Sequence, residues 1–164
     1  MSKSLAADMF VRRSRDITDL TIFAAMMAES EPWVTLVMGY NELLDMVSDP
    51  CREVYLAHVD ESILGFVVVE MNGAFTGYIK SICVSSLHRG RGVGGKLMAY
   101  AEHRVFREKP NVFLCVSSFN VAAQGFYRRL GYETVGELKD YLVSGQSEIL
   151  MRKTIAPLRA FTAE

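Results

Sequence analysis

The chain has 164 residues, of which half are hydrophobic and 23% are charged, a composition that indicates a globular domain and excludes a disordered chain. Its 18 basic and 19 acidic residues give a formal net charge of −1, so no overall basic field indicates a nucleic-acid partner. No apolar run approaches the roughly 20 residues of a membrane helix, and we expect no membrane span. We predict a single domain over 1–164, with its core at about 9–154 and a short tail at 155–164.

The three cysteines, Cys51, Cys83 and Cys115, are widely spaced and fit neither a zinc-binding pattern nor a disulfide framework. Asp8 and the pair Arg12-Arg13 interrupt any apolar run near the N-terminus, so we predict no signal peptide. The sequence therefore predicts a cytoplasmic protein without a metal site.

Turn signals separate the apolar runs in the first half of the sequence. Asp16 is suited to cap a helix over 17–28, because its carboxylate can accept a hydrogen bond from an N–H of the first turn. The dipeptide Asp60-Glu61 joins two apolar runs and predicts a hairpin. The expected elements, in chain order, are a strand at 9–13, a helix at 17–28, an irregular segment at 29–38 around Pro32, a helix at 40–47, and strands at 53–58, 63–71 and 78–84.

Strands and helices alternate in the second half. Val93, Leu97, Ala101 and Val105 recur at every fourth position, which gives a helix over 92–107 one apolar face. Gly131 lies where the C-terminal cap of a helix over 120–130 belongs. The other expected elements are a buried strand at 112–116 and final strands at 132–143 and 148–153. The order β-α-α-β-β-β-α-β-α-β-β predicts an α/β fold, a mixed sheet with helices on both faces.

The run from Arg89 to Lys96, which reads Arg-Gly-Arg-Gly-Val-Gly-Gly-Lys, is the most informative stretch of the chain. It presents backbone N–H groups with little side-chain bulk where a helix begins. Because a helix N-terminus carries unpaired N–H groups and a partial positive charge, such a turn can bind a phosphate group. The cations Arg89, Arg91 and Lys96 would strengthen that attraction.

Two phosphate-binding motifs match this run in spacing but lack their usual context. Gly90-x-Gly92-x-x-Gly95 fits the dinucleotide fingerprint, yet the segment 85–89 separates it from the preceding strand, and no acidic residue ends the strand at 112–116. Gly90 and the pair Gly95-Lys96 fit a Walker A loop, but the next residue is Leu97 instead of Ser or Thr.

The residues on both sides of the run resemble the two signatures of the GNAT family of N-acetyltransferases. The segment from Arg89 to Gly94 matches the family's pyrophosphate signature, Arg/Gln-x-x-Gly-x-Gly/Ala. Downstream, the family's Asn-x-x-Ala-x-x-Phe-Tyr-x-x-x-Gly-Phe is matched by Asn120, Ala123, Phe126, Tyr127 and Gly131, with Tyr132 in place of the last Phe. The resemblance covers roughly 10–153. It implies a mostly antiparallel seven-stranded sheet and transfer of an acetyl group from acetyl-CoA to a primary amine.

By this resemblance, coenzyme A is bound by the strand at 82–84, the glycine-rich run and the helix after Asn120. The implied residues are Ile82, Cys83, Val84, Arg89, Gly90, Arg91, Gly92, Val93, Gly94, Gly95, Asn120, Ala123, Phe126 and Tyr127. Asn120 has a second interpretation as the N-cap of its helix, and the glycine run has one as a plain helix start.

Tyr127 stands where the family keeps its general acid, which protonates the departing thiolate. The alternative is a core aromatic residue beside Phe126. The family's general base is often a Glu on the fourth or fifth strand, but those positions carry Tyr78 and Cys115 here. Glu70, at the end of the third strand, is the nearest acidic candidate for the base.

Glu31-Pro32-Trp33 resembles the Pro-Trp loop of the ribosomal-protein N-terminal acetyltransferases, and Asp140-Tyr141 stands where they carry Asn-Tyr-Tyr. We therefore expect Trp33, Tyr78 and Tyr141 to bind the acceptor. A small-molecule amine, a peptide or protein N-terminus and a lysine side chain all stay open. The alternative function is a non-catalytic acetyl-CoA-binding regulator or scaffold, and the apolar final strands are compatible with a homodimer.

Overall fold

The structure is a computed structural model that describes residues 9–163. Asp8, which contributes to the prediction of no signal peptide, lies outside the described residues, as do the rest of 1–8 and Glu164. Among the helices of this described range, none combines the length and the apolar character that crossing a membrane requires.

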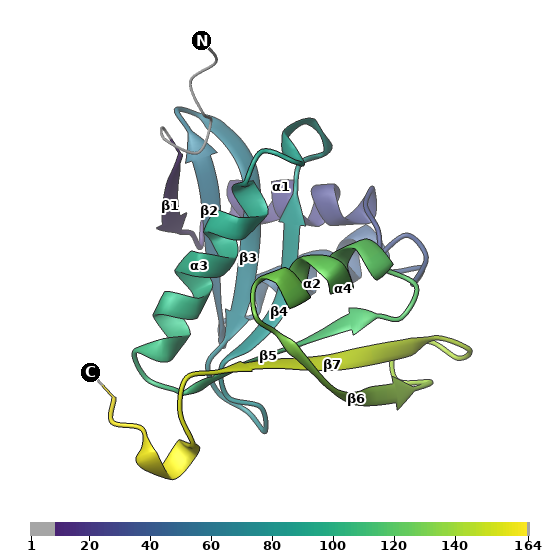
Figure 1. The fold of residues 1–164 in the computed structure, drawn as a ribbon. Helices are drawn as coiled ribbons and strands as arrows, with labels where there is room; N and C mark the ends of the chain where they lie inside the picture. The colour runs from purple at the N-terminus through teal and green to yellow at the C-terminus, as the bar shows by residue number, and fades with distance from the viewer. Residues whose placement is uncertain (1–8, 164) are drawn as a thin grey trace.

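A seven-stranded sheet runs through the described part of the chain, with strand order β1-β2-β3-β4-β5-β7-β6 (Figure 1). The strands are β1 Phe10–Arg13, β2 Arg52–Val59, β3 Ser62–Glu70, β4 Tyr78–Val84, β5 Asn111–Ser117, β6 Glu133–Lys139 and β7 Ser147–Thr154. Neighbouring strands are antiparallel except β4 and β5, which are parallel. The predicted mixed and mostly antiparallel sheet is confirmed.

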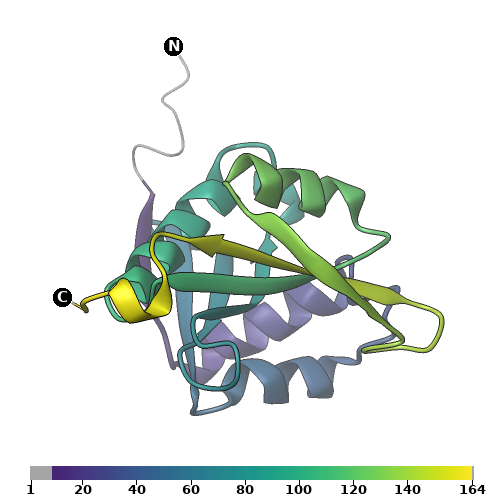
Figure 2. The ribbon, with the colours of Figure 1, turned by 60° about the horizontal axis from the view of Figure 1, so that its bottom comes forward.

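Two helices cover each face of the sheet (Figure 2). They are α1 Ile17–Ala28, α2 Tyr40–Ser48, α3 Val93–Phe106 and α4 Val121–Arg129, and short 3-10 turns η1 Ser86–His88 and η2 Leu158–Ala160 complete the elements. The α1–α2 face is held by a cluster that includes Phe23, Met27 and Leu43. The α3–α4 face is held by a second cluster that includes Leu97, Leu114 and Tyr127.

The local signals act as the sequence predicts. The Asp16 carboxylate accepts a hydrogen bond from the N–H of Thr18 at 2.8 Å, and α1 keeps the predicted bounds 17–28. In α3 the four residues at every fourth position, Val93, Leu97, Ala101 and Val105, are all buried in the core.

The largest boundary difference concerns the strand predicted at 132–143, which ends at Lys139. Asp140 takes a positive φ of 51°, and its carboxylate accepts a hydrogen bond from the N–H of Gly145 at 2.6 Å. This bond closes a turn over 140–146, so the chain reverses earlier than its apolar pattern indicates.

Candidate active site

A cavity opens where β4 and β5 separate. These strands pair only at Tyr78 with Phe113 and Ile79 with Leu114. Beyond that point β4 follows β3 as far as Val84, while β5 follows β7 as far as Ser117, and the two strands diverge (Figure 1). The gap forms part of a cavity of about 740 Å³, whose walls include both diverging strands, the start of α3, and α4.

A β-bulge in β4 lies beside the gap. Val69 pairs with Ile79 and Val68 pairs with Ser81, which leaves Lys80 as the extra residue. A bulge changes which face of the sheet the following side chains take. Ile79 packs in the cluster on the α3–α4 face, whereas Cys83 belongs to the cluster on the α1–α2 face. Lys80 itself lines the cavity.

The glycine turn lies at the end of the cavity formed by the start of α3. Gly90 and Gly92 have φ values of 72° and 82°, in the left-handed region that favours glycine. Gly92 is the N-cap of α3 and supplies no side-chain oxygen to the helix. The N–H of Lys96 is the one that reaches back to the Gly92 carbonyl, so the N–H groups of residues 93–95 have no partner within the helix. The turn is thus suited to an anion.

Of the three cations beside the turn, Arg89 alone lines the cavity. Its guanidinium donates to the Val84 carbonyl and to the Ser30 hydroxyl, each at 3.2 Å, and so ties the turn to β4 and to the segment after α1. The Lys96 ammonium donates to the carbonyl of Met9. Arg91, predicted to bind coenzyme A, lies outside the cavity lining and is exposed.

The wall formed by α4 contains the second signature. The Asn120 side chain accepts from the N–H of Ala123 at 3.2 Å, so its interpretation as an N-cap is confirmed. Phe126 lies opposite the glycine turn, since a Cβ at Gly94 would come within 3.4 Å of its ring. These residues line the cavity together with Tyr127.

Tyr127 belongs both to the cavity wall and to the core. It is 7% exposed, and its ring lies 5.3 Å from that of Phe126, so the predicted aromatic pairing is present as well. Burial raises the pKa of the Tyr127 phenol, because the charged phenolate is poorly solvated there. The phenol therefore keeps its proton at neutral pH.

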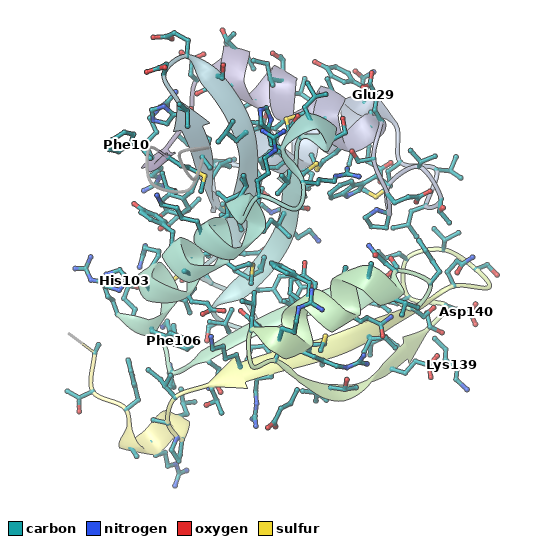
Figure 3. All side chains as sticks on the ribbon, turned by 45° about the horizontal axis from the view of Figure 1, so that its top comes forward. Phe10, Glu29, His103, Phe106, Lys139 and Asp140 are labelled. Carbon is teal, nitrogen blue, oxygen red and sulfur yellow. The ribbon has the colours of Figure 1, made fainter. Side chains whose placement is uncertain are left out.

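The opposite part of the cavity contains the three residues predicted to bind the acceptor, Trp33, Tyr78 and Tyr141. Trp33 is 7% exposed and also packs in the core cluster of the α1–α2 face. Burial and a hydrogen bond with Cys115 raise the pKa of the Tyr78 phenol. The two strand positions where the family often carries its base are therefore in contact here. Figure 3 labels Glu29 and Asp140, and the lining residues of this wall begin soon after them, at Glu31 and at Tyr141.

Glu148, which the sequence does not single out, also lines the cavity. It is 4% exposed, and its Oε1 accepts a hydrogen bond from the Ser117 hydroxyl at 2.6 Å. Burial raises the pKa of the Glu148 carboxyl, and the bond from Ser117 opposes part of that rise. In the sequence Glu148 only marks the start of the last strand. Its place beside the gap follows from the pairing of β7 with β5, which no local pattern reveals.

Glu70, the acidic residue predicted as the base, is not brought to the cavity. The lining found for residues 9–163 does not include it, although Glu70 pairs with the lining residue Tyr78, and its carboxylate lies 3.4 Å from the Arg52 guanidinium. The geometry therefore opposes the role predicted for Glu70.

The cavity has two parts with different chemical character, one on each side of the gap between β4 and β5. On one side, unpaired N–H groups at the glycine turn favour a negatively charged ligand. On the other, a buried carboxylate lies among aromatic and aliphatic side chains, which suits an amine. Tyr127 supplies a phenol at the cavity wall.

Comparison with known proteins finds a relative that is named an N-acetyltransferase and a solved acetyltransferase structure with a similar fold. An uncharacterized N-acetyltransferase of Methanocaldococcus jannaschii is 33% identical over 101 residues, which cover 60% of this chain and 64% of the relative. An aminoglycoside 6'-N-acetyltransferase solved with coenzyme A has a TM-score of 0.72 at 20% identity, covering 90% of this chain and 98% of the other. That structural likeness concerns the fold.

An N-alpha-acetyltransferase of Sulfurisphaera tokodaii is 27% identical over 111 residues, which cover 59% of this chain and 66% of the relative. The chain thus matches less than two thirds of the length of either archaeal relative. The model of the acetyltransferase (GNAT) family matches residues 17–132, which include the glycine turn, Tyr127 and most of the sheet. The chain therefore belongs to the GNAT family of acetyltransferases.

Proposed function

We propose that this protein is an N-acetyltransferase that moves an acetyl group from acetyl-CoA directly to a primary amine. The observation that carries the proposal is that the glycine turn and Tyr127 line one continuous cavity, with a route between β4 and β5 for a second substrate. Family membership and the names of the relatives support the same activity.

The residues present fit coenzyme A. The N–H groups of residues 93–95 would bind its pyrophosphate, and Gly92, where an added Cβ would meet no atom within 4 Å, leaves room for the phosphate oxygens. The pantetheine arm would run along Ile82–Val84, which line the gap on the β4 side. The bound ligand supplies an acetyl group activated as a thioester.

The part of Tyr127 is to hold a proton where the thiolate departs. Its raised pKa keeps the phenol protonated, so it can donate a hydrogen bond to the sulfur, and the negative charge that develops on the sulfur then draws the proton across. The Asn120 side-chain amide can still donate to the pantetheine, because its cap of α4 uses only the oxygen.

The acceptor stays open between a small-molecule amine, a peptide or protein N-terminus and a lysine side chain. The relatives' names include both an N-alpha-acetyltransferase and an aminoglycoside acetyltransferase, so they support an amine without selecting one. The free thiols of Cys51, Cys83 and Cys115 support the proposed cytoplasmic location. A homodimer and the lack of a nucleic-acid partner stay predictions from the sequence.

The first test is calorimetric titration of the purified protein with acetyl-CoA, with NADH and ATP as controls. We expect micromolar binding of acetyl-CoA alone. Thiol release that requires both acetyl-CoA and an amine would then separate the enzyme from the alternative, a non-catalytic acetyl-CoA sensor. A folded, ligand-free sample that binds no acetyl-CoA would exclude both.

A further inference from the structure

Glu148 is the acidic group of the cavity that has no other task. Within the described chain, the acidic residues of the lining are Glu31 and Glu148. Glu31 is exposed and already accepts hydrogen bonds from the backbone N–H and the hydroxyl of Thr35, at 3.2 and 3.0 Å. Glu148 is buried, and among residues 9–163 only Ser117 donates to it. Its second carboxylate oxygen therefore remains available to a ligand.

The register of the sheet places Glu148 on the acceptor side. Leu114 and Val116 of β5 pack in the cluster of the α3–α4 face, together with Tyr127. Because strand side chains alternate, the intervening Cys115 and Ser117 face the α1–α2 side. Glu148 pairs directly with Ser117 and shares that face. Glu148 and Tyr127 thus approach the gap from opposite faces of the sheet.

The neighbouring groups Cys115 and Tyr78 are both protonated, so Glu148 is the group that can accept a proton on the acceptor side of the gap. Burial, with a further contribution from the Glu148 charge, raises the pKa of the Cys115 thiol, so that thiol is protonated at neutral pH. Tyr78, whose phenol pKa is raised too, is also protonated. Lys80 is the cation close enough to act on Cys115, and Tyr141 acts on Tyr78 from the turn after β6. A carboxyl whose pKa is raised by burial is a stronger base than an exposed one.

We propose that Glu148 binds the acceptor ammonium and takes its proton, so that the free amine can attack the thioester. This inference rests on the proposed acetyltransferase function. The ammonium loses two protons in all. Glu148 receives the first and passes it to solvent; the nitrogen then bonds to the carbonyl carbon as the carbon–sulfur bond breaks. The second proton leaves the nitrogen for solvent as the amide forms, the thiolate takes a proton from the Tyr127 phenol, and solvent returns a proton to the resulting phenolate.

The same wall limits the kind of amine. One uncommitted carboxylate can neutralise one ammonium, and Lys80 opposes a second cation. The wall also contains aromatic and aliphatic side chains: Trp33, Leu36, Met38, Tyr78, Tyr141 and Leu142. The acceptor is therefore a monoamine with an apolar or aromatic body, and 2-phenylethylamine is a suitable probe against the polycation spermidine.

The experiment measures kcat/KM for 2-phenylethylamine between pH 6 and 9 in the wild type, Glu148→Gln and Glu137→Gln. Glutamine can still accept the bond from Ser117, and Glu137 is an exposed carboxylate on the neighbouring strand β6. At pH 7 we expect Glu148→Gln to lower kcat/KM by about 10² to 10⁴-fold with unchanged acetyl-CoA affinity. Its rate should rise about tenfold per pH unit as free amine accumulates. Glu137→Gln should follow the wild type.

A second variant, Ser117→Ala, tests the same role while Glu148 is still present. Because the bond from Ser117 lowers the pKa of Glu148, its removal should move the acid limb of the wild-type profile to higher pH. A purely structural Glu148 would leave that limb in place.

The outcomes distinguish a failure of the role of Glu148 from a failure of the proposed acetyltransferase function. A wild type that binds no acetyl-CoA overturns the proposed function. A wild type that binds acetyl-CoA but acetylates spermidine in preference to 2-phenylethylamine, or neither amine, overturns the amine class. A Glu148→Gln variant within threefold of the wild type across the pH range, or an unmoved acid limb in Ser117→Ala, overturns the role of Glu148.

Discussion

Burial raises the pKa of both ionisable side chains on either side of the gap, and each takes a different role as a result. The phenol of Tyr127 is neutral when protonated, so burial keeps it protonated and available as a hydrogen-bond donor. The carboxylate of Glu148 is charged when it has lost its proton, so burial makes it a better acceptor. One apolar cavity thus provides a donor on one side of the sheet and an acceptor on the other.

Replacing Tyr127 by Phe tests the donor. The change removes the hydroxyl and keeps the ring that packs at 5.3 Å from Phe126, so the fold and the acetyl-CoA affinity should be retained. We expect kcat to fall by about 10 to 10⁴-fold, the range for a lost general acid. Thiol release at saturating substrates gives kcat, and calorimetry gives the affinity. An unchanged kcat would remove Tyr127 from the reaction.

The ionised Glu148 carboxylate should lower the free energy of unfolding at neutral and higher pH. Its folded-state pKa is raised above the unfolded value, so the folded protein binds this proton more tightly and loses stability as pH rises through the raised pKa. Glu148→Gln cannot ionise and should therefore have a higher Tm than the wild type at pH 8. Below the unfolded pKa, near pH 4, the difference should vanish. Scanning calorimetry of both proteins at the two pH values measures this, and a lower Tm for the variant at pH 8 would contradict it.

At the scale of secondary-structure elements, the start of α3 and the end of β4 together form the anion-binding part of the cavity. Gly92 begins the helix in a left-handed conformation, and Arg89 fastens the preceding turn to the Val84 carbonyl at 3.2 Å. The β4 bulge at Lys80 and the short β4–β5 pairing open the sheet beside it. The site thus depends on where elements start and stop.

Gly92→Glu, matched with Gly145→Glu, tests this element. The two glycines have nearly equal φ values of 82° and 80°, and an added Cβ would meet no atom within 4 Å at either position. Both variants should lose about 1 to 2 kcal/mol of stability from the left-handed conformation. Only Gly92→Glu should also weaken acetyl-CoA binding, by about tenfold or more, because its charge lies at the pyrophosphate. Equal affinity in the two variants would exclude the turn as the phosphate site.

At the scale of the molecule, packed helices cover opposite faces of one sheet (Figure 2), and the cavity is lined by residues from both faces. Its lining draws on the segment after α1, on β4, β5 and β7, and on α3 and α4. A ligand that fills it would contact elements on both faces of the sheet. Binding should therefore stabilise the folded chain as a whole.

Acetyl-CoA at 100 times its Kd should raise the free energy of unfolding by about 2.7 kcal/mol, since it binds only the folded state. For a domain of this size, that gain corresponds to a rise in Tm of about 5 to 10 °C. Thermal unfolding with and without the ligand measures the shift, with NADH and ATP at equal concentration as controls. An equal shift with ATP would indicate that the turn binds any nucleotide phosphate.

Much of the fold could be predicted because its signals are local. The cap at Asp16, the apolar positions of α3 and the turn at Asp60-Glu61 each depend on residues close in the chain. The element order and the helices on both faces follow from those signals. The glycine turn is also a signal made by neighbouring residues. Its position at the cavity agrees with the coenzyme A site that the resemblance to the GNAT family implies.

What the sequence by itself determined is therefore the set of elements, the family and the glycine turn with Tyr127. The tertiary structure alone decided which carboxylate enters the cavity. Glu70 pairs directly with Tyr78 across β3 and β4, yet its carboxylate lies 3.4 Å from the Arg52 guanidinium and outside the cavity lining. Glu148 is 31 residues from Ser117, and only the pairing of β5 with β7 brings the two together. Strand pairing is a long-range choice set by the packing of whole elements, so no local pattern could have distinguished these two acids.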